Sequence, residues 1–235
     1  MKTLVFCTVA AVGDDPLDAY WRIRAGRWVD AIQSSRLRAD QVLLVDDGSE
    51  VLPQWSDTEI RRRLNAEQSA APVVMYHFDN RLGRQSDWFP GWYRSFSFAA
   101  LYAFRYGFEK VVHIESDAFL ISDPVQDYVN GLTAGWTSLW CPRHNIPESS
   151  IQIIAGDQMR AFLAMQAQPY EDLRNRGVIE NILPFTHVEK RFKGDRYAES
   201  NPSAPLVPRD ADYVAQTVGI YPDSFFWWLK PAAEL

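Results

Sequence analysis

Four short apolar runs constrain the fold of this chain more than any other feature of its sequence. Each run is nearly continuous and rich in β-branched residues, and the runs cover residues 4–9, 42–45, 73–78 and 111–114. Strands that are buried on both faces have this composition, because neither face meets water. Apolar side chains recur at helical spacing in residues 18–34 and 92–106, between the first two runs and the last two. The alternation of strand and helix predicts an α/β fold with a largely parallel sheet and flanking helices.

The second half of the chain predicts further strands in mixed directions. Residues 137–141 and 150–155 have strand patterns, and residues 157–165 have a helical one. From residue 201 onward prolines interrupt each candidate element, while the aromatic run 225–228 requires burial. We expect this tail to pack across the body. No repeat or low-complexity linker divides the sequence, so residues 1–235 are expected to form a single domain with a mixed sheet.

Charge and composition disfavour several classes of protein. The 235 residues carry a formal net charge of −6, which argues against a nucleic-acid partner held by phosphate neutralisation. No apolar run reaches the roughly eighteen residues that a membrane span needs, although peripheral contact with a membrane through aromatic side chains stays open. Cys7 and Cys141 both lie in apolar segments, which predicts buried free thiols and a cytoplasmic protein. The sequence leaves the oligomeric state open.

The segment VVHIESDAFLIS, residues 111–122, carries the clearest chemical signal. An apolar strand leads directly into Glu115, Ser116 and Asp117. Carboxylates two positions apart on an extended segment point to one face. An isolated acidic pair at a strand end is more typical of a turn. Two hard oxygen ligands can also hold Mn²⁺ or Mg²⁺ and leave coordination positions for a diphosphate.

This segment resembles the D-x-D motif of glycosyltransferases with the GT-A fold, including the small residue between the carboxylates and the apolar continuation AFLISDP. The resemblance implies a GT-A-like, Rossmann-type mixed sheet, a nucleotide-diphospho-sugar donor, and Glu115 and Asp117 as ligands of Mn²⁺ or Mg²⁺. It also implies donor contacts from Thr8 and Ser116. Glu115 stands where the motif has its first Asp, so we expect direct ligation to shift toward Asp117.

Two further segments agree with this resemblance. Asp46 and Asp47, in LLVDDGS, match the place where GT-A enzymes hold acidic residues against the uracil or ribose of the donor. Residues 78–96 are similar to the arginine-containing stretch at this point of the superfamily. Arg84 and Arg94 are therefore expected to reach diphosphate oxygens, which suit the planar fork of a guanidinium.

The second half is expected to complete the site. Many GT-A enzymes take a third metal ligand from a C-terminal histidine, and the resemblance points to His187. An inverting enzyme also needs a general base for the acceptor hydroxyl. Glu180 is the first candidate for that base, followed by Glu148 and Asp157. A retaining enzyme would need no such base.

The resemblance covers roughly the first 125 residues. It implies a nucleotide-sugar-binding half, residues 1–125, and an acceptor-side half with a C-terminal tail, residues 126–235. The implied function is metal-dependent transfer of a sugar from a UDP- or GDP-sugar to a glycan or lipid-linked acceptor, in the cytoplasm or at the inner face of the membrane. Such acceptors include the intermediates of surface polysaccharides.

Three other classes of function compete with this one. A non-catalytic glycan- or partner-binding protein on a degenerate GT-A fold stays open. A sugar-phosphate nucleotidyltransferase would share the architecture, but its glycine-rich phosphate loop is absent after the first strand. An oxidoreductase is disfavoured because no G-x-G-x-x-G turn follows that strand.

Overall fold

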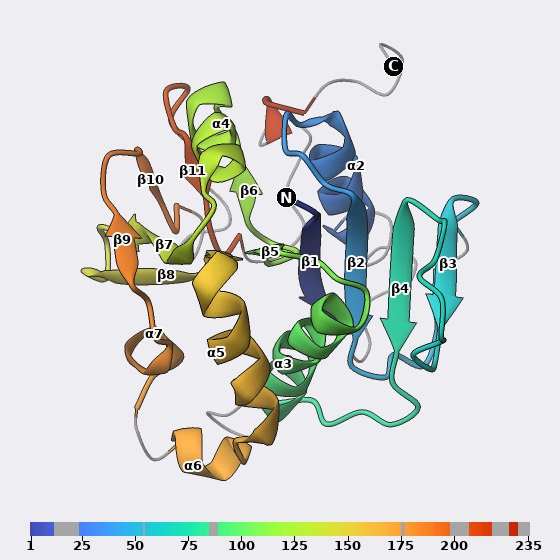
Figure 1. Ribbon diagram of the computed structural model, residues 1–235. Helices are drawn as coiled ribbons and strands as arrows, with labels where there is room; N and C mark the ends of the chain where they lie inside the picture. The colour runs from blue at the N-terminus through green and yellow to red at the C-terminus, as the bar shows by residue number, and fades with distance from the viewer. Residues whose placement is uncertain are drawn as a thin grey trace.

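An eight-stranded sheet forms the centre of the molecule, with a three-stranded sheet beside it (Figure 1). The computed structural model describes residues 1–11, 24–53, 55–84, 89–174, 177–197, 207–217 and 226–229. The strands of the large sheet, in spatial order, are β3 (Thr58–Arg61), β4 (Val73–His77), β2 (Gln41–Asp46), β1 (Thr3–Val9), β5 (Lys110–Ile114), β8 (Ile146–Ala155), β7 (Gly135–Cys141) and β9 (His187–Glu189). The small sheet consists of β10 (Gly194–Asp195), β11 (Tyr213–Val214) and β6 (Phe119–Leu120).

The large sheet is mixed but mostly parallel, as the sequence predicts. β3, β4, β2, β1 and β5 are parallel to one another. β8 runs antiparallel to both of its neighbours, β5 and β7, and β9 is parallel to β7. The predicted α/β fold with a largely parallel sheet and flanking helices is therefore confirmed.

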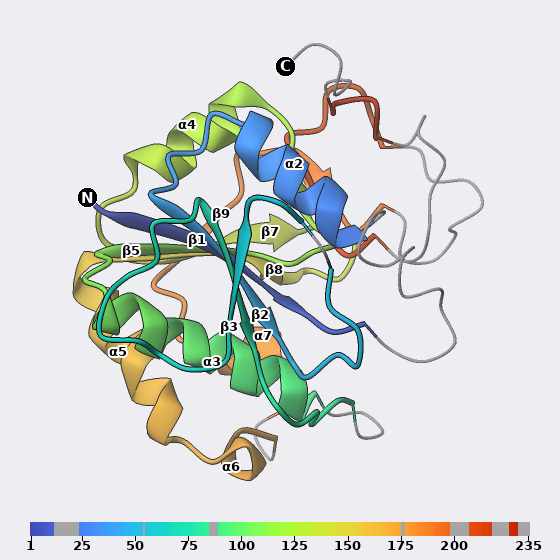
Figure 2. The same cartoon turned by 90° about the vertical axis from the view of Figure 1, so that its right-hand side faces the viewer.

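Helices cover both faces of the sheet (Figure 2). The helices are α2 (Arg27–Ser34), α3 (Pro90–Arg105), α4 (Asp123–Gly131), α5 (Met159–Ala164), α6 (Tyr170–Arg174) and α7 (Ile179–Ile182). α2 and α4 pack on one face, and α3 and α5 on the other. The expected helix over residues 18–34 is present where the structure describes it, and residues 12–23 lie outside the described part.

Strand β1 shows why its sequence is apolar throughout. Val5, Cys7 and Val9 face the core under α2 and α4, while Leu4 and Phe6 face the core under α3. All five side chains are buried. Burying a side chain of this size contributes about 1.5–3 kcal/mol relative to exposure, so both faces of this strand stabilise the sheet.

The order of the strands creates a switch point beside β1. The chain adds β2, β4 and β3 on one side of β1 and then crosses back, through α3, to place β5 on the other side. The carboxyl ends of these parallel strands meet at one edge, and the crevice at such a switch point is where open α/β sheets bind ligands. Because β8 is antiparallel, its amino-terminal half reaches the same edge.

Other expectations from the sequence are also met in the described part. Cys7 and Cys141 are free and buried. Phe226 and Trp228 from the tail pack against Phe119, with ring centroids 5.7 and 5.8 Å from that ring. Residues 201–206, 218–225 and 230–235 of the expected tail lie outside the described residues. Within the described stretches, no helix has both the length and the apolar character to cross a bilayer.

Lys110, at the start of β5, is a buried cation that holds the end of α4. Its ammonium donates to the carbonyls of Val129 and Asn130, in the last turn of that helix. Burial lowers the pKa of Lys110 to about 8, and the nearby charge of Arg38 acts in the same direction. The charged form of Lys110 is favoured by its position at a helix C-terminus and disfavoured by its removal from water.

We predict that the Lys110→Met substitution removes a pH dependence of stability. The pKa of Lys110 is about 8 in the fold and 10.5 for an ordinary lysine, so between these values the unfolded chain binds more protons and stability rises with pH. The unfolding free energy of the wild type, relative to the variant, should increase by about 2 kcal/mol from about pH 7.5 to pH 9.5. Urea unfolding at both pH values measures it, with exposed Lys193→Met as control. The prediction would be contradicted if the difference in unfolding free energy between the wild type and Lys110→Met did not change with pH.

Candidate functional site

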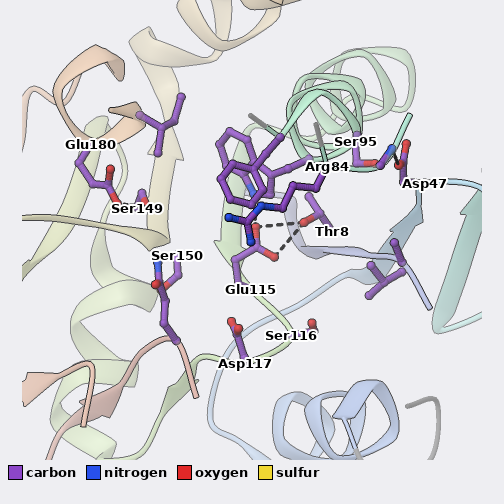
Figure 3. Close-up of a pocket in the computed structure, with 18 of the residues that line it drawn as sticks. Thr8, Asp47, Arg84, Ser95, Glu115, Ser116, Asp117, Ser149, Ser150 and Glu180 are labelled. Atoms are coloured by element: carbon purple, nitrogen blue, oxygen red, sulfur yellow. Dashed lines mark hydrogen bonds between the residues drawn. The ribbon is translucent and has the colours of Figure 1, made fainter. Parts of the chain in front are cut away.

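A cavity of about 730 Å³ lies at the switch-point edge of the sheet (Figure 3). This volume is typical of pockets for small ligands. One side of the cavity is formed by Thr8 of β1 and Asp47 after β2, and its floor by Glu115 after β5. The opposite side is formed by Ser150 of β8 and Glu180 of α7. Both halves of the chain therefore contribute to one pocket.

Glu115 is held as a carboxylate by donors from three elements. The Thr8 hydroxyl lies 2.8 Å from Oε2 and 3.0 Å from Oε1, and His113 Nε2 lies 2.9 Å from Oε1. The indole N–H of Trp92, on α3, also donates to Oε1. Burial by itself raises the pKa of Glu115, but the charge of His113 and these hydrogen bonds outweigh it, so the pKa is below its ordinary value. Glu115 is an anion on the floor of the pocket.

Asp117 points into the same pocket and pairs with Arg24. The guanidinium donates from Nη2 to Asp117 Oδ2 at 2.8 Å and from Nε to Ser116 Oγ at 3.0 Å. Burial raises the pKa of Asp117, the charge of Arg24 opposes that rise, and the neighbouring charge of Glu115 adds to it. The two carboxylates and Arg24 thus form one charged group beside the end of β5.

Asp47 lies on the side of the pocket formed by β2 and α3. Its carboxylate accepts from the backbone N–H of Gly83 at 2.7 Å and from the guanidinium of Arg94. Gly91, in the first turn of α3, approaches so closely that a Cβ at this position would overlap the Asp47 carboxylate. Arg94 also stacks on Phe78, with 4.0 Å between its guanidinium carbon and the ring centroid. Arg94 therefore positions Asp47 and is not among the pocket-lining residues.

Asp46, next to Asp47, is fully buried beneath the pocket. It accepts from the backbone N–H of Ser49 at 2.9 Å and lies 2.6 Å from His77 Nδ1. These contacts fix the turn after β2 and leave Asp46 out of the pocket lining. The expected donor contact of Asp46 has no place in this geometry, because adjacent residues at the strand end point in different directions.

Glu180 lies on the opposite side of the pocket. Its Oε1 accepts from the hydroxyl of Ser149 at 3.0 Å and from the guanidinium of Arg196 at 2.9 Å. Arg196 also binds both oxygens of Glu148, at 2.8 and 3.2 Å. Glu148 is fully buried and does not line the pocket. Of the two glutamates, Glu180 is the one that a ligand in the pocket can reach.

Asp157 and His187 are not brought to the pocket. Asp157 follows the carboxyl end of β8, and because β8 is antiparallel this end lies at the edge of the sheet away from the pocket. Its side chain accepts from the backbone N–H of Gly135 at 2.9 Å. His187 starts the edge strand β9, is 55% exposed and lies 3.7 Å from Glu189. Neither residue lines the pocket that contains Glu115 and Asp117.

The pocket thus gathers one part of the residues expected from the sequence. Those that line it are Thr8, Asp47, Arg84, Glu115, Ser116, Asp117 and Glu180. Those that do not are Asp46, Arg94, Glu148, Asp157 and His187. The gathered set comes from strand ends that the parallel topology places side by side.

Several residues of the pocket were not expected from the sequence. They include Arg24, Arg196 and the serines Ser95, Ser149 and Ser150. Arg24 lies within the predicted helix 18–34, and the sequence around it does not indicate that its side chain pairs with a buried carboxylate. The serines belong to no sequence motif that would predict a place in the site. These residues reach the pocket through contacts between distant parts of the chain, such as the 92 positions that separate Arg24 from Ser116.

The donor atoms of the pocket fit a divalent cation that arrives together with a diphosphate. Glu115 and Asp117 offer hard oxygen ligands, and one oxygen of Asp117 is engaged by Arg24. Among the described residues, no group of three or more His, Cys, Asp or Glu side chains is placed to hold a metal ion. Mg²⁺ is commonly held by one or two carboxylates together with substrate phosphates. A site with two carboxylates fits a cation that is bound together with phosphates better than one that the protein holds permanently by itself.

The solved structures that are similar to this chain include two glycosyltransferases. No protein-family model and no curated protein matches the chain in sequence. It is similar to a mannosyltransferase from Pyrobaculum calidifontis in complex with GDP-Man and Mn²⁺, at 12% identity and a TM-score of 0.42, over 68% of this chain and 46% of that one. It is also similar to a glycosyltransferase involved in glycosylation of the major capsid of PBCV-1, at 9% identity and a TM-score of 0.45, over 94% of this chain and 96% of that one. The chain therefore spans less than half the length of the mannosyltransferase.

We predict that the Arg196→Met substitution destabilises the fold strongly. Glu148 is fully buried, and removing its guanidinium partner leaves an uncompensated charge that costs about 3–5 kcal/mol. Denaturant unfolding measures this loss. A double variant that also carries Glu148→Gln should recover a large part of it, because the orphaned charge is gone. A loss below about 1 kcal/mol, as for an exposed ion pair, would contradict this role of Arg196.

Proposed function

We propose that this chain is a glycosyltransferase of the GT-A kind that uses a nucleotide-diphospho-sugar as its donor. The observation that carries the proposal is the position of Glu115 and Asp117, two carboxylates on the floor of a pocket at the switch point of the sheet. Asp47, which is expected to contact the nucleoside, lies on one side of this pair, and a third carboxylate, that of Glu180, lies on the other. A reaction that joins a donor to an acceptor requires these three regions in one cavity.

The lining of the pocket supports one orientation of the donor. The nucleoside would lie toward Asp47, and the diphosphate toward Thr8, Ser116 and the arginines Arg24 and Arg84. Hydroxyl and guanidinium groups are suitable partners for phosphate oxygens. The sugar would then point toward β8. In this orientation residues 1–125 serve the donor and residues 126–235 face the acceptor.

Glu115 and Asp117 would hold Mn²⁺ or Mg²⁺ together with the diphosphate. A bound cation of this kind neutralises negative charge on a leaving nucleoside diphosphate. The chain would hold the carboxylate oxygens of Glu115 and Asp117 in place for this cation. Thr8, Trp92 and His113 orient Glu115 and favour its ionised form.

Glu180 is our candidate for the general base of an inverting reaction. Its Oε1 is held by Ser149 and Arg196. No described residue donates a hydrogen bond to Oε2, which leaves that oxygen for the hydroxyl of an acceptor. A carboxylate in hydrogen-bond reach of the acceptor hydroxyl can remove its proton as the new bond forms.

The mouth of the pocket supports a glycan or lipid-linked glycan as the acceptor. Phe89 and Val178 line the cavity and are 47% and 57% exposed. These side chains offer apolar surface beside the pocket that an acceptor can cover. The apolar faces of sugar rings pack well on an aromatic ring such as that of Phe89.

We predict that one nucleoside diphosphate binds in a metal-dependent manner. Isothermal titration of UDP, GDP, CDP and dTDP, each with Mn²⁺ and with EDTA, should give binding of one of them that weakens at least about tenfold without the cation. The protein alone should bind Mn²⁺ much more weakly than it does in the presence of that nucleotide, because two carboxylates are an incomplete ligand set.

The Asp117→Ala substitution should abolish the metal-dependent part of this binding. Asp79→Ala is the matched control, since Asp79 is an exposed aspartate paired with Arg62 at 2.8 Å outside the pocket. Unchanged affinity in Asp117→Ala would remove Asp117 from the donor site. Absence of binding for all four nucleotides would favour the non-catalytic glycan- or partner-binding protein instead.

A further inference from the structure

Two serines that line the pocket carry buried hydroxyls with no hydrogen-bond partner in the described part of the chain. Ser95 is 0% exposed and Ser150 is 2% exposed. Among the described residues, neither hydroxyl has a hydrogen-bond partner. Both serines line the cavity. Most buried polar side chains in proteins are hydrogen-bonded, because an unpaired buried hydroxyl loses its contact with water and gains nothing in return. Two such hydroxyls in one cavity indicate a ligand that pairs with them.

The local geometry of β8 explains how Ser150 reaches the pocket. Neighbouring residues of a regular strand point to opposite faces, yet Ser149 and Ser150 both line the cavity. The register between β7 and β8 shifts here, from Ser138 opposite Gln152 to Leu139 opposite Glu148. Such a bulge redirects side chains and occurs often beside active sites.

The backbone around Ser150 is fixed independently of its hydroxyl. Its carbonyl accepts from the backbone N–H of Glu115 at 2.9 Å, and its own N–H donates to Glu148 Oε1 at 3.0 Å. Ser150 is therefore tied directly to the strand end that carries the carboxylate pair. Its hydroxyl stays available to a ligand beside that pair.

Ser95 lies on the other side of the pocket. It is one helical turn after Gly91 and shares with it the face of α3 that approaches Asp47. Figure 3 shows Ser95 beside Asp47 on one side of Glu115, and Ser150 on the other side near Ser149. The two serines thus lie on opposite sides of Glu115.

We propose that these hydroxyls bind the two ends of the donor, Ser150 the transferred sugar and Ser95 the nucleoside. This inference rests on the function proposed above and assigns its two subsites. A serine hydroxyl both donates and accepts, which matches the hydroxyls of a sugar and the polar groups of a nucleoside. Ser150 contacts the strand end with the carboxylate pair and is next to Ser149, which holds Glu180. The sugar therefore lies between the diphosphate and the candidate base.

The experiment compares nucleoside diphosphates with their sugar conjugates. Isothermal titration with Mn²⁺ measures UDP, GDP, UDP-glucose, UDP-galactose and GDP-mannose on the wild type and on Ser95→Ala and Ser150→Ala. Loss of one hydrogen bond weakens binding roughly three- to tenfold. Ser150→Ala should weaken the sugar nucleotide by that factor and leave the nucleoside diphosphate unchanged. Ser95→Ala should weaken both ligands equally.

Two buried serines outside the pocket serve as matched controls. Ser97 of α3 donates to the carbonyl of Arg94 at 3.3 Å, and Ser138 of β7 donates to the carbonyl of Glu148 at 2.8 Å. Ser97→Ala and Ser138→Ala should lower the melting temperature and leave both affinities unchanged. Ser95→Ala and Ser150→Ala remove no hydrogen bond within the described protein, so their melting temperatures should equal or exceed that of the wild type.

The outcomes separate this inference from the proposed function. If the wild type binds a sugar nucleotide and both variants bind it with wild-type affinity, the subsite assignment is wrong and the proposed function stands. Equal weakening of both ligands by Ser150→Ala would place Ser150 at the nucleotide and overturn its assignment to the sugar. If the wild type binds none of these ligands and neither CDP nor dTDP, the proposed function fails and the subsites fail with it.

Discussion

The carboxylate of Glu115 is the contact on which the pocket depends. It is bound by Thr8 from β1, by His113 from β5 and by Trp92 from α3. These three elements meet at the point where the strand order reverses, and the carboxylate joins them there. A carboxylate in such a place must be paired, because an unpaired buried charge is strongly unfavourable. Through the indole N–H of Trp92, this carboxylate also links α3 to the sheet.

Charge in the pocket is balanced by residues from distant segments. The described lining contains four arginines and four acidic residues, namely Arg24, Arg81, Arg84, Arg196, Asp47, Glu115, Asp117 and Glu180. Arg24 pairs with Asp117 on one side of the pocket, and Arg196 is shared between Glu148 and Glu180 on the other side. A diphosphate that enters with a divalent cation brings roughly compensating charges, so this balanced pocket accommodates the pair better than either alone. The ion and the nucleotide are therefore expected to bind together.

The sequence predicts the central sheet well because both faces of its strands are covered. Residues 4–9, 42–45, 73–78 and 111–114 all became strands of the large sheet. Strand β3 was missed because its sequence, TEIR, is polar and it lies at the sheet edge. α4 was missed although it carries a recognisable start, with Ser122 as N-cap and Pro124 in the first turn.

The site was predictable only where it follows strand ends. Parallel strands bring Thr8, Asp47 and Glu115 to one edge by topology alone. The direction of β8 could not be read from its composition, and it decides that Ser150 enters the pocket while Asp157 lies at the opposite edge. Whether a residue of the second half belongs to the site therefore depends on strand direction and on a local bulge.

The most direct test of the account is the position of the cation in a crystal of the protein grown with Mn²⁺ and the nucleoside diphosphate that binds. Anomalous scattering at the manganese edge locates the ion independently of the surrounding model. The account predicts a peak within bonding distance of an Asp117 carboxylate oxygen and of the diphosphate, with the nucleoside directed toward Asp47. A nucleotide bound outside this pocket, or a manganese peak away from Glu115 and Asp117, would contradict it.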